Sequence, residues 1–206
     1  MLKLWGRLNS INVQKAVLTL EELGLPYERT DAGLEFGVNK SAEYLAMNPN
    51  GLVPTLNDDG FVLWESNAIT RYLCARYAAG TFWHEDLRIR ADADRWMDWQ
   101  ATTLSPGMGP CFAGLVRTPP EKRNLDAIEQ GRVKTIKAVA MLEANLADRE
   151  YVAGADYGMA DLSLAPIMHR WLNMPCERGD TPNVARWYGR LMARPACQRV
   201  LTLPIT

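Results

Sequence analysis

The 206-residue sequence has few cysteines, few histidines and no excess of either charge. The cysteines are widely separated, and none forms a Cys-x-x-Cys pair; they are Cys74, Cys111, Cys176 and Cys197. This spacing is typical of reduced thiols and disfavours both a redox couple and a zinc site. We therefore expect free, buried cysteines and no metal.

The two histidines, His84 and His169, do not lie near a serine or cysteine nucleophile motif. A Ser-His-Asp mechanism therefore has no support.

The 23 basic and 24 acidic side chains nearly cancel, so no electrostatic field favours nucleic acid or an anionic membrane. Charged residues interrupt each apolar segment before it could span a bilayer, and Met1-Leu2-Lys3 leads directly into a short alternating run without a signal peptide. We expect a cytoplasmic protein with neither a nucleic-acid nor a membrane partner.

The most informative segment runs from Asn48 to Pro54, with the sequence Asn-Pro-Asn-Gly-Leu-Val-Pro. An X-Pro pair that enters a short apolar strand is a place for a cis peptide bond, and proline leaves the preceding backbone without a strand partner. Val53 can therefore offer its N–H and C=O groups to a ligand.

Glu65 and Ser66 follow a hairpin whose turn is Asp58-Asp59-Gly60, and they stand where a helix is expected to begin. The Ser66 hydroxyl and the free N–H groups of that helix suit a carboxylate, while Glu65 can face an ammonium group. Together they predict a site for the charged head of an amino acid.

These residues resemble the glutathione S-transferase family along nearly the whole chain. In that family the valine before a cis-proline pairs with the cysteinyl backbone of glutathione, and an acidic-Ser pair holds the γ-glutamyl head; Val53-Pro54 and Glu65-Ser66 match these places. The run from Trp5 to Val13, Trp-Gly-Arg-x-Asn-Ser-x-Asn-Val, is similar to bacterial members. The resemblance implies glutathione as a substrate.

The resemblance has two further implications. Related proteins place a basic side chain just before the Asn-Pro segment, which makes Lys40 a candidate for the glycine carboxylate of glutathione. Family members usually pair the first domain of one subunit with the helical domain of the other, which implies a homodimer. Trp64 and Arg71 would border that contact.

The periodicity predicts an α/β thioredoxin-like domain over residues 1–79, in the order βαβ, a crossover helix and ββα. Residues 80–86 form the predicted linker, and residues 87–206 the predicted all-helical domain, which carries part of the electrophile site. Its helices are expected over Leu87–Leu104, Leu125–Ala147, Ala160–Leu172 and Asn183–Ala193, with prolines including Pro106 and Pro110 between them.

Asp161 resembles the acidic residue of the family's buried capping motif, but Gly158 replaces the hydroxyl residue that normally caps the helix. Asp161 can still accept a hydrogen bond from the start of the helix, while the reciprocal bond is missing. We expect a structural role for it.

The turn from Arg7 to Asn12 must stabilise the thiolate, and it contains neither tyrosine nor cysteine. Lowering a thiol pKa by about two units requires roughly 2.7 kcal/mol. One charge-assisted hydrogen bond of roughly 1.5–3 kcal/mol, with a helix N-terminus adding roughly 0.3–1 kcal/mol, is sufficient. Ser10 and Asn12 are the candidates, with Asn12 ranked slightly higher, and each can instead be only a helix cap.

Arg7 and Arg117 are candidates for the electrophile site, where a cation would favour an anionic electrophile or a departing halide; each can also be a solvated surface arginine. The favoured function is attack of the glutathione thiolate on a small electrophile. One alternative is glutathione-dependent disulfide or peroxide reduction, and another is a non-enzymatic glutathione-binding or interaction protein.

Overall fold

A four-stranded mixed sheet organises the first part of the chain in the computed structural model, which describes residues 1–201 and 205–206. The strands are β1 (Leu2–Trp5), β2 (Tyr27–Thr30), β3 (Thr55–Asp58) and β4 (Phe61–Trp64), in the order β2-β1-β3-β4. Strand β1 is parallel to β2 and antiparallel to β3, which forms a hairpin with β4. The turn of this hairpin uses positive φ at Asp59 and Gly60, as the sequence predicts.

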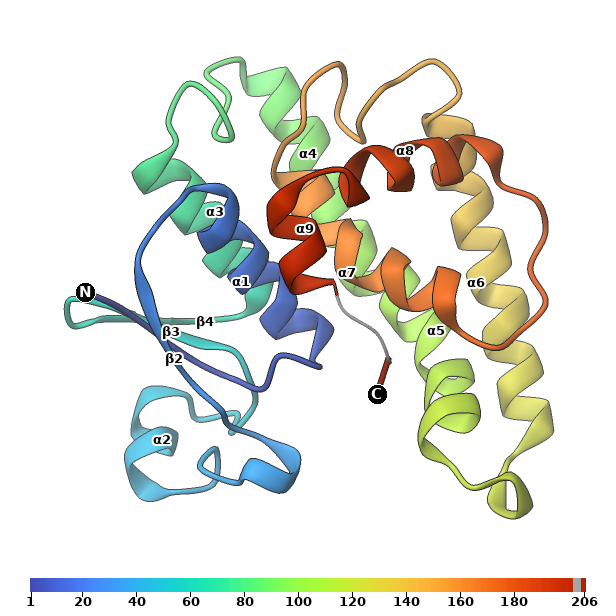
Figure 1. The fold of residues 1–206 in the computed structure, drawn as a ribbon, viewed down its shortest axis with the longest axis horizontal. Coiled ribbons are helices and arrows are strands. Elements are labelled where there is room, and N and C mark those ends of the chain that lie inside the picture. The colour runs from blue at the N-terminus through green and yellow to red at the C-terminus, as the bar shows by residue number, and fades with distance from the viewer. Residues whose placement is uncertain (202–204) are drawn as a thin grey trace.

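Helices cover both sides of this sheet (Figure 1). Helices α1 (Ile11–Glu22) and α3 (Ser66–Tyr77) pack together on one side, and the short α2 (Ala42–Met47), after the 3₁₀ turn η1 (Leu34–Phe36), lies on the other. Gly24 ends the turn after α1 with a φ of 62°. The predicted thioredoxin-like order is confirmed.

The rest of the described chain is helical (Figure 1). Its α-helices are α4 (Leu87–Trp99), α5 (Ser105–Phe112), α6 (Leu125–Asn145), α7 (Met159–Asn173), α8 (Pro182–Met192) and α9 (Pro195–Val200), and a 3₁₀ turn, η4, spans Pro120–Lys122. The predicted all-helical second part is confirmed. Residues 202–204, within the predicted range of this part, lie outside the described residues, and α9 was not predicted.

The predicted break after Leu104 is wrong. Helix α4 continues through a π-helical turn, η2 (Gln100–Leu104), into α5, and a second π turn, η3 (Ala113–Arg117), follows. Pro106 lies in the first turn of α5 and Pro110 inside the helix, and each lacks the N–H that the continuous helical path would use. The π turns on either side are known places for a helix to bend, so the two prolines interrupt the hydrogen-bond ladder without ending the helical path.

Helix α7 runs through the centre of the molecule, and every side chain from Met159 to Trp171 is buried. It packs against α1 and α3 as well as α4 and α8. Asp161, in its first turn, is fully buried and accepts hydrogen bonds from Gly158 N (2.9 Å), Val152 N (3.0 Å) and Trp187 Nε1 (2.7 Å). Burial raises its pKa to about 6 against the effect of these donors. These contacts give Asp161 the structural surroundings that the sequence predicts.

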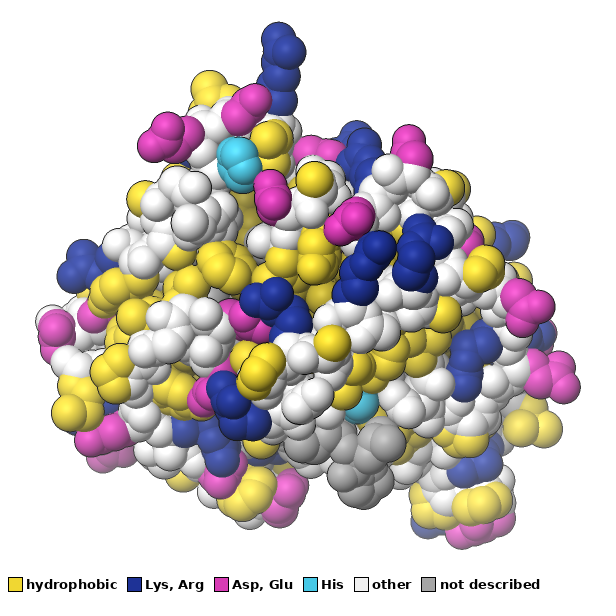
Figure 2. All heavy atoms as spheres, turned by 45° about the horizontal axis from the view of Figure 1, so that its top comes forward, with side chains coloured by type: hydrophobic (Ala, Val, Ile, Leu, Met, Phe, Trp, Pro, Cys, Tyr) yellow, Lys and Arg dark blue, Asp and Glu magenta, His cyan; other side chains and the backbone are white. Residues whose placement is uncertain are grey.

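All four cysteines are free, and only Cys176 departs from the expected burial, because it is partly exposed. On the face shown in Figure 2, basic and acidic side chains are interspersed, in keeping with the near-zero net charge. Within the described residues, no helix is long and apolar enough to cross a membrane, and no three His, Cys, Asp or Glu side chains gather as a metal site.

Candidate active site

A pocket of about 400 Å³ lies between the start of α1, the start of α3 and the π turn η2. Three of the predicted site residues, Asn12, Glu65 and Ser66, line this pocket together. Lys15 and Arg71 also line it. The structure therefore joins parts of the chain more than fifty residues apart into one polar cavity.

Ser66 is the first residue of α3, and its buried hydroxyl donates a hydrogen bond to Asn12 Oδ1 at 3.3 Å. Glu65 precedes the helix with a φ of 71° and makes no side-chain capping bond. A non-glycine residue in this backbone region is uncommon and often marks a functional site. The geometry leaves the Glu65 carboxylate exposed beside the free N–H groups of α3, so the site can meet a carboxylate and an ammonium group at once.

The Val53-Pro54 peptide bond is cis, as predicted. Strand β3 begins only at Thr55, so Val53 stands outside the ladder with β1. The loop before it is held by Asn48 Nδ2, which donates to Leu52 O at 2.9 Å, and by the Tyr44 hydroxyl, which donates to the same oxygen at 2.6 Å. Neither side chain was singled out from the sequence, although Asn48 opens the Asn-Pro motif.

Lys40 is exposed, and its ammonium group lies over the backbone of Gly51: a Cβ atom at that glycine would be 2.9 Å from Nζ. The side chain does not line the pocket between α1 and α3. Its predicted contact with the glycine end of glutathione stays a prediction.

Ser10 and Asn12 occupy different places at the start of α1. Ser10 is the N-cap residue and is nearly buried, but its hydroxyl makes no capping bond. Asn12 is exposed and turns its amide oxygen to Ser66, which leaves the donor end of the amide for a second partner. Both side chains therefore retain a donor that is not committed to the helix.

Arginine side chains gather at the junction of the two parts of the chain. Arg7 reaches Gly33, where a Cβ atom would be 2.9 Å from Nη1. The guanidinium carbons of Arg117 and Arg170 lie 4.8 Å and 3.8 Å from the centre of the Phe112 ring. The pKa of Arg170 is lowered to about 9, chiefly by burial and also by repulsion from Arg117 and Arg7. Burial and then Arg117 lower the pKa of Arg7 as well, while Glu35 opposes this effect.

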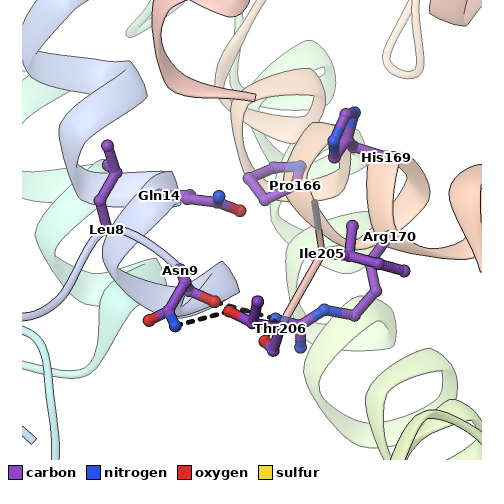
Figure 3. Close-up of a pocket in the computed structure, with 8 residues that line it drawn as sticks. All are labelled: Leu8, Asn9, Gln14, Pro166, His169, Arg170, Ile205 and Thr206. Atoms are coloured by element: carbon purple, nitrogen blue, oxygen red, sulfur yellow. Dashed lines mark hydrogen bonds between the residues drawn. The ribbon is translucent and has the colours of Figure 1, made fainter. Parts of the chain in front are cut away.

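Arg170 also lines a smaller cavity of about 190 Å³ shown in Figure 3. Its Nη2 atom donates to Asn9 O at 3.1 Å and to Thr206 O at 3.4 Å, and Arg117 Nη2 donates to Thr206 O at 3.0 Å. The Nε atoms of Arg7 and Arg170 are buried without a hydrogen-bond partner in the described part of the chain. The cluster can therefore accept an anion.

Lys15, like Arg170, is a candidate functional residue that the sequence analysis did not identify. It is 2 % exposed, and its Nζ atom donates to Asn67 Oδ1 at 3.2 Å, Ser66 Oγ at 3.4 Å and Gln100 Oε1. Its pKa is lowered to about 7, chiefly by burial, while Glu65 opposes this effect and Arg71 adds to it. In the sequence, Lys15 and Arg170 could have been noticed only as single cations within helices whose other residues are largely apolar and buried.

The comparisons with known proteins identify the family of the chain. Residues 1–75 match the model of the glutathione S-transferase N-terminal domain, and residues 109–195 match that of the C-terminal domain. The chain belongs to the glutathione S-transferase family. It is an enzyme with glutathione S-transferase activity.

Its relatives cover the whole chain. Glutathione S-transferase GstB of Escherichia coli strain K12 is 46 % identical over 208 residues, which cover 100 % of both proteins. The theta class glutathione S-transferase of Xanthomonas axonopodis pv. citri, solved with glutathione bound, has a TM-score of 0.96 at 41 % identity and covers 100 % of this chain and 99 % of its own. Maize glutathione S-transferase I, in complex with an atrazine glutathione conjugate, has a TM-score of 0.86 at 27 % identity, with 97 % and 96 % covered.

Proposed function

We propose that the protein binds glutathione in the pocket between α1 and α3 and directs its thiolate at a small anionic electrophile that carries a halogen. The observation that supports glutathione is that Glu65 and Ser66, at the N-terminus of α3, line one cavity together. These groups suit both charges of the γ-glutamyl head. Val53 would pair with the cysteinyl backbone, Asn12 or Ser10 would stabilise the sulfur, and Lys40 would reach the glycine carboxylate.

The proposed reaction is a displacement at carbon. The thiol proton leaves to solvent, the sulfur lone pair forms a C–S bond, and the halide departs with the electron pair of the C–X bond. A hydrogen-bond donor and the positive end of α1 stabilise the thiolate. The protein supplies position and electrostatics, and the peptide supplies the nucleophile.

The anionic character of the electrophile rests on the arginine cluster. Three guanidinium groups, from Arg7, Arg117 and Arg170, repel one another at the domain junction. Two of their Nε donors are buried without partners among the described residues. A carboxylate on the electrophile would satisfy those donors and reduce the repulsion. The same charge would favour a departing halide.

The test compares 2-chloropropionate with 2-chloropropionamide, which differ in charge but hardly in size. With glutathione present, chloride release and the thioether product are measured for both. We expect a higher kcat/KM for the carboxylate, and we expect Arg117→Met to remove this preference while sparing the amide. A preference for the amide in the unaltered enzyme would contradict an anionic electrophile. Oxidised glutathione formed from a disulfide or peroxide, without a thioether from any electrophile, would favour the reductase alternative.

We further propose a cytoplasmic, homodimeric enzyme that removes reactive electrophiles, with its domain boundary in residues 80–86. The near-neutral composition and the family support this proposal. Cell fractionation followed by immunoblotting tests the location, and recovery in the membrane or secreted fraction would contradict it.

A further inference from the structure

Lys15 presents an unusual electrostatic problem, because its cationic group is buried among neutral oxygens. Its three hydrogen-bond acceptors are the amide oxygens of Asn67 and Gln100 and the hydroxyl of Ser66. Within the described residues, Lys15 forms no ion pair. Burying an ammonium group is costly unless it is paired with an opposite charge.

The amide side chains of Asn67 and Gln100 are nevertheless oriented with their oxygens toward this ammonium group. Asn67 Nδ2 donates a hydrogen bond to Met97 O at 2.7 Å, and Gln100 Nε2 donates one to Ser105 Oγ at 2.6 Å. These bonds fix the amide orientation, so each oxygen faces Lys15. Ser163 Oγ, from α7, adds a donor to Asn67 Oδ1 at 2.8 Å. The network is therefore built around a fixed ammonium position.

A bound ligand would supply the negative charge that Lys15 lacks as a partner. A carboxylate oxygen that accepts the Ser66 hydroxyl proton at ~2.7 Å, in place of Asn12 Oδ1, would lie within about 6 Å of Lys15 Nζ, because Ser66 Oγ is 3.4 Å from that atom. At such a distance, opposite charges in a poorly solvated site attract one another appreciably. We propose that Lys15 is a positioning residue that acts through Ser66, and that binding of the γ-glutamyl carboxylate causes Lys15 to take up a proton. This inference rests on the proposed glutathione site.

Several other charged groups face this part of the pocket. Glu65 and Arg71 approach from the start of α3, and Asp98 from α4; Arg71 is itself paired with Asp94 and Asp98 at 2.6 Å. The nearest side chains of η2 and α7, Gln100 and Ser163, are neutral. Carboxylates and guanidinium groups ordinarily titrate far from pH 7.

The sign of the pH effect follows from the direction of the shift. Burial lowers the pKa of Lys15 to about 7, so the free enzyme holds a charged Lys15 below pH 7 and a neutral one above it. A bound carboxylate favours the charged form and raises this pKa. Affinity is therefore highest below pH 7 and falls as the pH rises, with proton uptake on binding in the interval above pH 7.

S-methylglutathione tests this inference, because it keeps both carboxylates but has no ionisable thiol. Calorimetry at pH 6 and pH 8 should show a five- to tenfold weaker affinity at pH 8. At pH 7.5, the binding enthalpy should depend on the ionisation heat of the buffer, as proton uptake requires. Equal affinity at the two pH values, with no buffer dependence, would overturn the inference.

Variants separate charge from packing. Lys15→Met keeps the apolar stem and should bind weakly and equally at both pH values, whereas Lys15→Arg should keep its charge and lose the pH dependence without losing affinity at pH 8. Lys137→Met, at an exposed position on α6, is the matched control and should behave as the unaltered enzyme. If Lys15→Met does not fold, the pH dependence of Lys15→Arg and the proton uptake of the unaltered enzyme still test whether Lys15 gains a proton on binding. An unaltered enzyme that binds no S-methylglutathione at either pH would refute the glutathione site itself.

Discussion

At the scale of single residues, the site combines side chains of two kinds. Glu65 and Ser66 stand at the open N-terminus of α3, where their sequence positions already identify them. Lys15 and Arg170 lie within buried helices, where the sequence identifies them only as helix positions. The first kind would meet the ligand directly, and the second kind provides charge at the walls of the cavities.

Glu65→Ala should weaken glutathione binding by roughly 1.5–3 kcal/mol, the value of a hydrogen bond to a charged group. The Glu65 carboxylate lines the pocket and does not cap α3, so its loss should leave stability nearly unchanged. Calorimetry with the folded variant measures this change, and Glu121→Ala, at another exposed acidic residue, is the control. Unchanged affinity would show that Glu65 is not in the glutathione site.

Asn12→Ala should raise the pKa of the bound thiol by one to two units, at about 1.4 kcal/mol per unit, and should reduce turnover more than binding. Ser10→Ala should have the milder effect, because the Ser10 side chain is nearly buried at the N-cap while Asn12 lines the pocket. The pH dependence of thiolate absorbance in the binary complex gives both values. If neither variant moves that titration, another group, with Arg7 the first to test, stabilises the sulfur.

The sequence predicted the local parts of this site and missed the long-range ones. Val53, Glu65 and Ser66 could be identified because proline, a hairpin turn and a helix start act on their immediate neighbours. The contact of Lys15 with Gln100 joins positions 85 residues apart, and no local pattern encodes it. Arg170 was missed for the same reason, since its neighbours include Asn9 and Phe112.

At the scale of elements, the strands and helices of the first part follow their sequence signals closely, and so do α6, α7 and α8 of the second part; the departures lie around α5 and at α9. Gly24, Asp59 and Gly60 have positive φ, which glycine permits and the tight turns at these positions require. Pro106 and Pro110 misled the prediction, because their local preference opposes a helix while the packing of α5 against α6 maintains one. Tertiary packing thus outweighed propensity.

Replacement of Asp161 tests how α7 is held at its first turn. Asp161→Ala would leave three N–H donors, two of them buried, without their acceptor and should lower the free energy of unfolding by roughly 2–4 kcal/mol. Asp161→Asn keeps one acceptor oxygen and should lose less. Urea unfolding followed by tryptophan fluorescence measures both variants. Equal stability of Asp161→Ala and the unaltered protein would refute the structural role.

At the scale of the whole molecule, β4 forms one outer edge of the sheet and exposes Phe61 and Trp64, at 51 % and 37 %. Arg71, expected to border a subunit contact, is engaged within the chain by Asp94 and Asp98. We predict that light scattering at micromolar concentration gives twice the mass of one chain, and that Trp64→Glu lowers it. A single-chain mass for the unaltered protein would contradict the homodimer.

The position of α7 has a consequence for how the molecule opens. Because this helix packs on α1 and α3 as well as on α4 and α8, one continuous apolar core serves both matched family domains. Separating them would expose the buried faces of α1 and α7 to water. The amide protons of α7 should therefore exchange with solvent only through global unfolding, and the slowest exchange rates should be shared by α1 and α7.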